Sequence, residues 1–329
     1  MPPFDARDPA LHDAAFHDAV PFDVRDPAFH DAVPEGARLE PVSTGHTFTE
    51  GPIWHPDGWL VFSDIAASRQ WRWRPSSNGG ETTLFRAPSN QANGNAFDPQ
   101  GRIVSCEHAT SQVVRHEHDG KLVRPIATHY PAGEGGRELN SPNDLVVDAK
   151  GRVFFTDPLY GRTRADLGLP REPELDFQGV YRLDPDGTLT LLADDFENPN
   201  GLCFSVDGTR LFVNDSPRGH IRVFDLRDGA VSGGAVWADV TGEGSDVSGS
   251  EVWVPDGMKT DTAGRIWCNG PGGVHLFSSD ARSLGVVFLP EKSTNFCFGG
   301  EGLRDLFITA STGVYRLRTA ATGLSMIPA

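Results

Sequence analysis

The sequence predicts an all-β protein, a six-bladed β-propeller with an irregular N-terminal arm, on the strength of three observations. Two hairpin signatures alternate along the 329 residues, with six copies of each. The copies recur at intervals of roughly 40–57 residues, close to the length of about 40–50 residues that a propeller blade needs. The 37 glycines and 25 prolines indicate many turns rather than long helices.

The first signature is an apolar pair, a turn that contains Asp and Gly, and a second apolar run. It spans 53–62 and recurs at 96–104, 146–155, 203–213 and 259–267, with a degenerate sixth copy at 296–308. The second signature, a strand, a polar turn and another strand, begins near Gln70, Val113, Gly179, His220, Gly273 and Gly313. Each signature predicts a hairpin, and two hairpins make one four-stranded blade. The alternative, a β-sandwich, is disfavoured because the two signatures alternate without exception.

The last blade lacks a closing strand, because its second hairpin stops after one strand, at Leu317. The segment 38–42 precedes the first blade and has no partner of its own. We expect this segment to complete the last sheet, which closes the ring and removes an open edge. The sequence thus divides into an arm, 1–36, and a propeller domain, 37–329.

The arm contains a short duplication, in which 4–14 recurs as 22–32. Its histidines and aspartates are compatible with metal binding, but we expect a solvated or loosely docked tail. Deletion of 1–21, which removes the extra copy, is predicted to leave activity largely unchanged.

The composition argues against several classes of protein. With 45 acidic and 29 basic residues the formal net charge is −16, which repels phosphate backbones and argues against nucleic-acid binding. Cys106, Cys203, Cys268 and Cys297 are far apart, so we expect buried free thiols in a reducing compartment, not a zinc site. The chain shows neither a signal peptide nor a long apolar run. We therefore expect a cytoplasmic monomer or small homo-oligomer with no membrane partner.

One polar position recurs in every copy of the first signature. Eight residues before the turn glycine stands a carboxylate or a carboxamide, and the sixth copy has one at nearly the same place: Glu50, Asn93, Asn143, Asn200, Asp256 and Asn295. Equivalent positions in a propeller are related by rotation, so these side chains should converge on the central channel. Such a ring of oxygen ligands suits a hard divalent cation. The alternative is that Asn-Gly and Asp-Gly are ordinary turns, which does not explain Glu50.

Signatures of other catalytic sites are missing from the sequence. It contains no G-x-S-x-G nucleophile elbow, no H-E-x-x-H, no Walker loop and no G-x-G-x-x-G. The ring of oxygen ligands is therefore the candidate site.

Several short strings occur in the order found in a known family. They are Glu50-Gly51-Pro52-Ile53-Trp54, Asn93-Gly94, 101–108, Asn140-Ser141-Pro142-Asn143-Asp144, Phe155-Thr156-Asp157-Pro158, Tyr160-Gly161, Pro199-Asn200-Gly201, Pro255-Asp256-Gly257 and Phe298-Gly299-Gly300. With these strings the chain, over about 22–317, resembles the gluconolactonase family that includes the senescence marker protein regucalcin. The likeness is greatest to the bacterial gluconolactonase branch.

The resemblance implies a six-bladed propeller with one catalytic metal in its channel. By motif, the family's metal ligands fall on Glu50, Asn200 and Asp256, and its Asn that contacts metal-bound water or substrate falls on Asn143. We count Asn143 with the metal site for that reason. Regucalcin-like members carry an arginine at the position of Ser141, and the bacterial branch commonly has an Arg-rich strand where this chain has 111–115. These departures leave the particular lactone open.

The predicted function is hydrolysis of a small sugar-type lactone with one divalent cation, calcium first, with zinc, magnesium and manganese as alternatives. A metal on the lactone carbonyl stabilises the oxyanion, Asp256 serves as ligand or proton acceptor, and Asn143 orients water or substrate. The predicted substrate-binding residues are Asn93, His108, Asn143, Asp157, Tyr160 and Asp215. Four of these, His108, Asp157, Tyr160 and Asp215, could equally be structural.

Two other functions remain open at this stage. The first is hydrolysis of a phosphotriester or an aryl ester, which a metal-filled channel would also support. The second is a non-enzymatic calcium-binding propeller, since propellers often serve as binding platforms.

Overall fold

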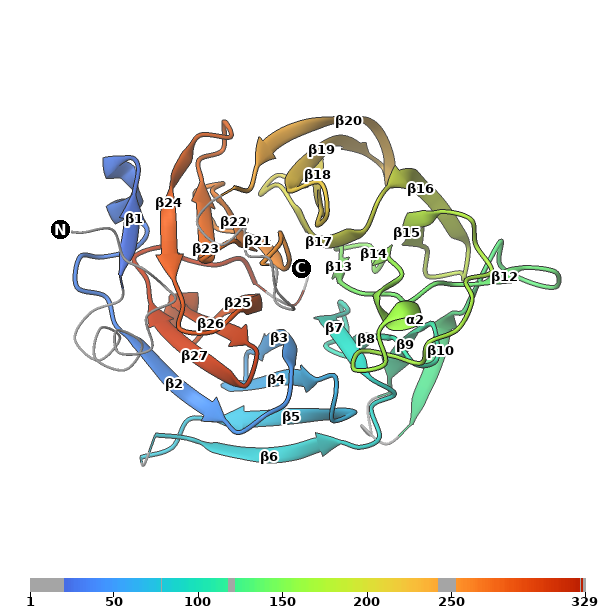
Figure 1. Cartoon of the computed structure of the whole chain (residues 1–329), viewed down its shortest axis with the longest axis horizontal. Helices are drawn as coiled ribbons and strands as arrows, with labels where there is room; N and C mark the ends of the chain where they lie inside the picture. The colour runs from blue at the N-terminus through green and yellow to red at the C-terminus, as the bar shows by residue number, and fades with distance from the viewer. Residues whose placement is uncertain (1–20, 78, 118–121, 242–252, 326, 328–329) are drawn as a thin grey trace.

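Six sheets, five with four strands and one with a fifth strand added, stand around a central axis like the blades of a propeller (Figure 1). This computed structural model describes residues 21–77, 79–117, 122–241, 253–325 and 327. In each blade a copy of the first signature begins on the innermost strand and ends on the second strand. The predicted fold class is confirmed.

The strands of the six blades follow one another along the chain. Blades one and two are β3 (Thr49–His55), β4 (Trp59–Asp64), β5 (Arg69–Arg74), β6 (Glu81–Arg86), and β7 (Ala92–Phe97), β8 (Ile103–Glu107), β9 (Gln112–His116), β10 (Val123–Ala127). Blades three and four are β13 (Leu145–Val147), β14 (Val153–Asp157), β15 (Gln178–Leu183), β16 (Leu189–Phe196), and β17 (Pro199–Phe204), β18 (Arg210–Asp215), β19 (His220–Arg227), β20 (Ala230–Asp239). Blade five is β21 (Met258–Thr260), β22 (Ile266–Gly270), β23 (Gly273–Phe277) and β24 (Ser283–Phe288). Blade six is β25 (Ser293–Gly299), β26 (Asp305–Ala310), β27 (Gly313–Arg318) and β2 (Leu39–Thr44).

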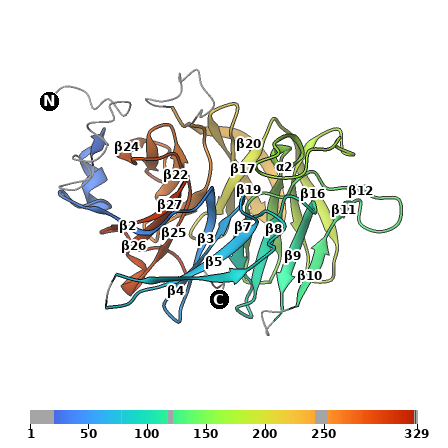
Figure 2. The same cartoon turned by 60° about the horizontal axis from the view of Figure 1, so that its bottom comes forward.

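A few short elements lie outside the blades. The pair β11 (His129–Tyr130) and β12 (Arg137–Glu138) projects from the ring between the second and third blades (Figure 1). The one-turn helix α2 (Tyr160–Thr163) lies at one end of the ring, near the upper edge of Figure 2. A 3₁₀ turn covers Glu301–Leu303. In the described part of the chain, no helix is long and apolar enough to cross a membrane.

An aspartate and an arginine shape the turn in the first signature. Asp98 Oδ1 accepts the N–H of Arg102 at 2.9 Å, and Asp98 Oδ2 pairs with Arg102 Nε at 2.7 Å. Between them Gly101 has a φ of +74°, which a side chain would strain. The same contacts recur at Asp148 with Arg152 and at Asp261 with Arg265. The signature is therefore a hairpin turn that the sequence specifies locally.

The ring closes through its first and last segments, as predicted. Strand β2 pairs antiparallel with β27, with Leu39 opposite Leu317 and Thr44 opposite Gly313. The sixth blade therefore contains strands from both ends of the described chain. Closure removes the open edge that β27 would otherwise present.

The second copy of the duplication is docked, which corrects the expectation of a solvated or loosely docked arm. Strand β1 (Phe22–Val24) adds a fifth strand to blade five by pairing with β24, and a 3₁₀ turn follows at Pro27–Asp31. The Phe29 side chain is fully buried in the cluster that includes Trp267 and Leu284. The reason is hydrophobic, because Phe29 and part of Phe22 are buried among apolar side chains of blades five and six. The first copy, 4–14, lies outside the described residues.

Apolar clusters fill the spaces between neighbouring blades. One cluster contains Trp54, Trp73 and Phe307, with the rings of Trp54 and Phe307 stacked at 5.0 Å between blades one and six. The four cysteines are buried and free, in β8, β17, β22 and β25, as the sequence predicts. The core therefore lies between the sheets and leaves the channel to polar side chains.

Candidate active site

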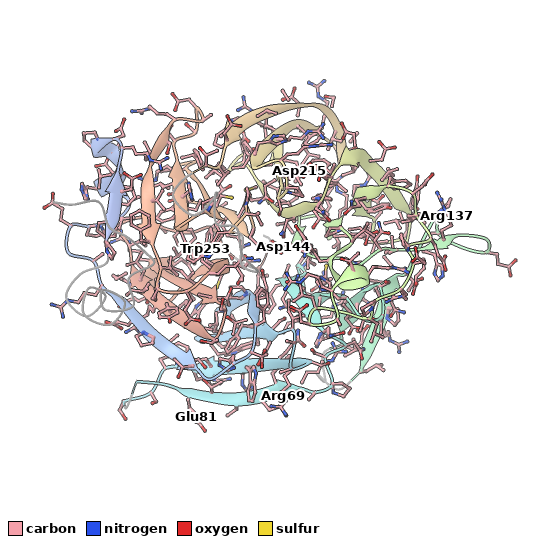
Figure 3. The ribbon with its side chains drawn as sticks, viewed as in Figure 1. Arg69, Glu81, Arg137, Asp144, Asp215 and Trp253 are labelled. Carbon is pink, nitrogen blue, oxygen red and sulfur yellow. The ribbon has the colours of Figure 1, made fainter. Side chains whose placement is uncertain are left out.

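All six repeat positions gather at one end of the channel, as the rotation argument predicts. Glu50, Asn93, Asn200 and Asn295 lie in the innermost strands β3, β7, β17 and β25, and Asn143 and Asp256 lie just before β13 and β21. Each is buried, and Asp256, at 9%, is the most exposed of the six. Asp144, the neighbour of Asn143, marks the channel in Figure 3. Five of the six, all but Asn295, line one cavity of about 320 Å³.

Glycines that follow the ring residues allow the blades to approach closely. A Cβ on Gly94 would lie 2.6 Å from the carbonyl oxygen of Asn143, and one on Gly201 would lie 2.1 Å from that of Asp256. Both glycines lie inside strands, β7 and β17. They are therefore not turn residues, and each instead admits the backbone of the next blade's ring residue.

Hydrogen bonds from the preceding blade hold the ring residues in place. Ser63 Oγ donates to the carbonyl oxygen of Asn93 at 2.7 Å. Thr156 Oγ1 donates to that of Asn200 at 2.8 Å. Asn214 Nδ2 does the same for Asp256. The donors lie in β4, β14 and β18, the second strands of their blades, so the backbone of the site is set by contacts between blades.

Two carboxylates, those of Glu50 and Asp256, line the same cavity. Burial, with the charges of Asp256 and Asp144, raises the pKa of Glu50 well above its usual value. Burial is also the main cause of a raised pKa at Asp256, opposed by the positive charge of Lys292. Glu50 Oε2 accepts the N–H of Gly51 at 2.6 Å. Such crowded negative charge is what a bound cation would relieve.

The side-chain amide of Asn200 belongs to the same cavity as the Glu50 and Asp256 carboxylates. Its Nδ2 donates to Ser216 Oγ at 3.1 Å, and Ser216 Oγ donates to the carbonyl oxygen of Pro255 at 2.6 Å. Its Oδ1 is buried and has no hydrogen-bond partner among the described residues. An unsatisfied buried oxygen beside two carboxylates fits a hard metal ion.

The candidate donor set contains amides as well as carboxylates. Within the described ranges, no group of three or more His, Cys, Asp or Glu side chains is placed to hold a metal. The set proposed here has two carboxylates, Glu50 and Asp256, and its other donors are amides. Oxygen donors of this kind fit the cation chemistry that the sequence predicts.

We expect Gly201→Ala to disturb the geometry of the site, although the substitution adds only one methyl group. The added methyl would meet the Asp256 carbonyl at 2.1 Å, so β17 or the Asp256 backbone must shift. Overpacking of this kind costs about 1–3 kcal/mol, measured by urea unfolding. Calcium affinity by calorimetry should also fall. The matched control is Gly208→Ala, which has a φ of +67° and open space around it, and should lose stability without losing affinity. Equal affinities in the two variants would contradict this reading of Gly201.

The loop around α2 forms one wall of the cavity and supplies Tyr160, Arg164 and Leu167. Ser141 holds this wall segment (158–168), because its Oγ donates to the carbonyl of Pro158 at 2.6 Å and accepts the N–H of Gly161 at 2.9 Å. Burial raises the pKa of the Tyr160 hydroxyl, which keeps it protonated. Ser141, which stands where regucalcin-like members carry an arginine, therefore supports this wall of the cavity.

The buried arginine of α2 anchors the wall segment from behind. Arg162 Nη2 donates to Glu138 Oε2 and to the carbonyl of Leu139, both at 2.6 Å. Its Nε donates to the carbonyl of Asn140 at 2.9 Å. These bonds tie the wall to the segment that leads to Asn143.

Three residues predicted to bind substrate do not line the cavity. Asp157 Oδ2 accepts the N–H of Asn140 at 2.8 Å, and Asp215 accepts those of Glu197 and Asn198. Both aspartates end the second strand of a blade, where their carboxylates satisfy loop N–H groups. Burial raises the pKa of Asp157 to about 7.

His108 stands behind the cavity wall. Its Nε2 lies 3.2 Å from Asn93 Nδ2, and its Nδ1 lies 2.9 Å from the carbonyl oxygen of Leu167. Burial lowers the pKa of His108 to about 4, so the ring is neutral at pH 7. His108 therefore joins a ring residue to the wall segment without lining the cavity.

The repeats did not reveal several residues that line the cavity. They are Phe48, Ile65, Arg164, Leu167, Ser216, Pro217, Val254 and Lys292. All lie in loops that open at the ring end of the blades, either between the second and third strands or before an innermost strand. Loop position in the blade was the signal that could have found them.

A second hollow, of about 500 Å³, lies on the outside of the ring between β2 and the outer strands of blade one. Ser43 Oγ lies 2.7 Å from His46 Nε2, and His46 Nδ1 lies 3.7 Å from Asp64 Oδ2. That second separation is too long for a hydrogen bond, and Asp64 accepts the N–H groups of Thr47 and Phe48 instead. The hollow therefore has a Ser–His contact but lacks the carboxylate hydrogen bond that would complete a Ser-His-Asp triad, and the channel is the better candidate.

The chain is similar to known lactonases over most of its length. The SMP-30/Gluconolactonase/LRE-like region matches residues 48–312. A gluconolactonase from Zymomonas mobilis is 32% identical over 304 residues, which cover 87% of this chain and 82% of that protein. Pentonolactonase XacC from Haloferax volcanii is 30% identical over 287 residues, 83% of this chain and 84% of that protein.

A solved structure gives the same result. A gluconolactonase from Xanthomonas campestris superposes with a TM-score of 0.81 at 33% identity, covering 91% of this chain and 95% of that one. The resemblance drawn from the sequence motifs is confirmed, and this chain belongs to the SMP-30/gluconolactonase/LRE-like family.

Proposed function

We propose that this protein is a metal-dependent lactonase that hydrolyses a small sugar-type lactone at the ring end of its channel. The observation that carries the proposal is the meeting of two buried carboxylates and an unpartnered amide oxygen at one cavity. A volume of about 320 Å³ suits a small ligand. Relatives of about one-third identity are a gluconolactonase and a pentonolactonase, which supports a lactone as substrate.

Glu50, Asn200 and Asp256 would hold the cation, with Asn143 beside them. We propose calcium first, because every donor is an oxygen. When bound, the cation supplies Lewis acidity toward the lactone carbonyl oxygen.

The protein's own groups would then position the substrate and move the proton. Asp256 is the more exposed of the two carboxylates, and Glu50 is held by the N–H of Gly51. We therefore assign Asp256 as the group that accepts the proton of the attacking water and returns it to the ring oxygen that leaves. The amides of Asn93 and Asn143 line the cavity, where they can bond the hydroxyls of a sugar lactone.

The test is a substrate panel assayed with chelated and reconstituted protein. Gluconolactone, pentonolactones, an aryl ester and a phosphotriester are supplied with EDTA-treated protein, before and after addition of calcium, magnesium, manganese or zinc. We expect sugar lactones to be hydrolysed fastest and only with added cation. Faster turnover of the phosphotriester or aryl ester would favour a different hydrolase. Cation binding without turnover would favour a non-enzymatic propeller, and full activity in EDTA would contradict the metal.

A further inference from the structure

A partly buried lysine lies behind the ring residues, in a position that the proposed chemistry does not use. Lys259 stands three residues after Asp256, in β21, and its side chain is 16% exposed. Its Nζ donates to Asn295 Oδ1 at 3.1 Å and lies 3.9 Å from Asp144 Oδ2. Asn295 Nδ2 in turn donates to Asp144 Oδ2 at 3.3 Å. We call Asp144, Lys259 and Asn295 the polar floor.

The polar floor joins three blades across the channel. Asp144 belongs to blade three, Lys259 to blade five and Asn295 to blade six, and the Asp144 carboxylate lies by the channel in Figure 3. A Cβ on Gly257 would lie 2.2 Å from Asn295, so the chain leaves room for this amide. None of the three lines the cavity. The floor is therefore a second polar layer, distinct from the groups that face the substrate.

The floor is in electrostatic contact with the proposed metal ligands. Asp144 directly follows Asn143, and Lys259 stands three residues after Asp256, so the two floor charges lie next to the proposed ligands along the chain. Asn295 also contacts the Glu50 carboxylate, and so links floor and ring directly. Three carboxylates thus share the channel end, and Lys259 is the cation that stands among them at the floor. Fixed charges at such short range and low dielectric act strongly on a divalent ion.

We propose that Lys259 is a positioning residue that serves as a built-in counter-ion: it holds the channel carboxylates together in the metal-free protein and limits how tightly the divalent cation binds. The inference rests on the proposed function, because it assumes a cation at Glu50, Asn200 and Asp256. Lys259 with Asp144 forms a neutral pair behind the two ligand carboxylates, whose charge Lys292 already partly offsets. Removing Lys259 adds one net negative charge at the site, and removing the charge of Asp144 takes one away.

Removing the charge of Lys259 and removing that of Asp144 are predicted to shift calcium affinity in opposite directions. Loss of a purely structural contact would shift it in the same direction in both variants. Calcium is titrated by calorimetry into EDTA-treated, dialysed protein. Lys259→Met, nearly the same shape without the charge, should bind calcium at least about fivefold more tightly, and its metal-free form should have a lower Tm. Asp144→Asn should bind at least about fivefold more weakly. Lys259→Arg should stay near wild type, and the double variant should return to within about threefold of it.

The control is Lys150→Met, which removes a surface charge paired with Asp228 far out on a hairpin turn. It should leave calcium affinity within about twofold of wild type, which separates the floor from an effect of net charge. The inference is overturned if Lys259→Met and Asp144→Asn shift the affinity in the same direction, or if neither shifts it. Should Lys259→Met not fold, Lys259→Gln takes its place in the same comparison with Asp144→Asn. Wild-type protein that binds no cation would contradict the proposed function as well.

Discussion

Asp256→Ala is expected to lower kcat/KM for lactone hydrolysis by at least about a thousandfold, the largest effect of any single substitution we predict. The substitution removes one of two anionic ligands and the proposed proton acceptor together. The Asp256 backbone is held by Asn214, so the loss should come from the side chain and not from a collapsed strand. Initial rates are measured at saturating calcium beside metal content by elemental analysis.

Two further variants separate this role from general damage. Asn143→Ala should be milder, because that amide orients substrate or water and does not supply charge. Asp261→Asn is the matched control: Asp261 is also buried and lies on the same hairpin, but its carboxylate bonds Arg265 and Trp267 at the turn. Asp261→Asn should lower the free energy of unfolding while kcat/KM stays within about tenfold of the wild-type value. Asp256→Ala protein that keeps stoichiometric metal and near-wild-type turnover would refute the assignment.

Phe29→Ala is expected to destabilise the protein by about 3–5 kcal/mol, because it empties a fully buried aromatic site. The Phe29 ring packs in one cluster with Trp267, Leu284 and Leu317, which belong to blades five and six. The arm therefore stabilises the two blades beside the ring closure. The free energy of unfolding is measured in urea, with kcat/KM of the folded variant expected to remain close to wild type.

A truncation distinguishes the docked part of the arm from the rest. Removal of 1–20 keeps Pro21, whose carbonyl accepts the N–H of Phe288, and is expected to leave stability and activity largely unchanged. Removal of 1–33 should resemble Phe29→Ala or be worse. If both truncations behave alike, the buried ring is not the source of the arm's contribution.

Much of the site could be predicted from sequence, because equivalent positions in the repeats of a propeller lie at equivalent places around its axis. Turns such as that between Asp98 and Arg102 are specified locally, so the turn glycine of each copy gives a fixed reference position in its blade. Counting from that glycine reached Glu50 and Asp256, which are more than two hundred residues apart and meet at one cavity. Closure by β2 was likewise predictable, since a missing strand at one end matched a spare strand at the other.

The remaining features depend on contacts between distant segments. Asp157 and Tyr160 are three residues apart and each carries a polar group, yet one bonds a loop N–H group and the other lines the cavity. Nothing in their local strings separates them. The docking of Phe29 also has no local signal, because it requires the hollow that blades five and six form together.

The sequence by itself determined the propeller, its six blades, the closing strand and the ring of oxygen donors, because hairpin turns and repeat register are local and symmetry propagates them. Only the tertiary structure decided which polar side chains face the cavity, how the wall segment is held by Ser141 and Arg162, and how the arm docks. It also brought Asp144, Lys259 and Asn295 together from three blades. Those arrangements follow from close packing and from the cost of leaving a buried polar group unpaired. Both depend on residues that are distant in sequence, which the repeat pattern does not identify.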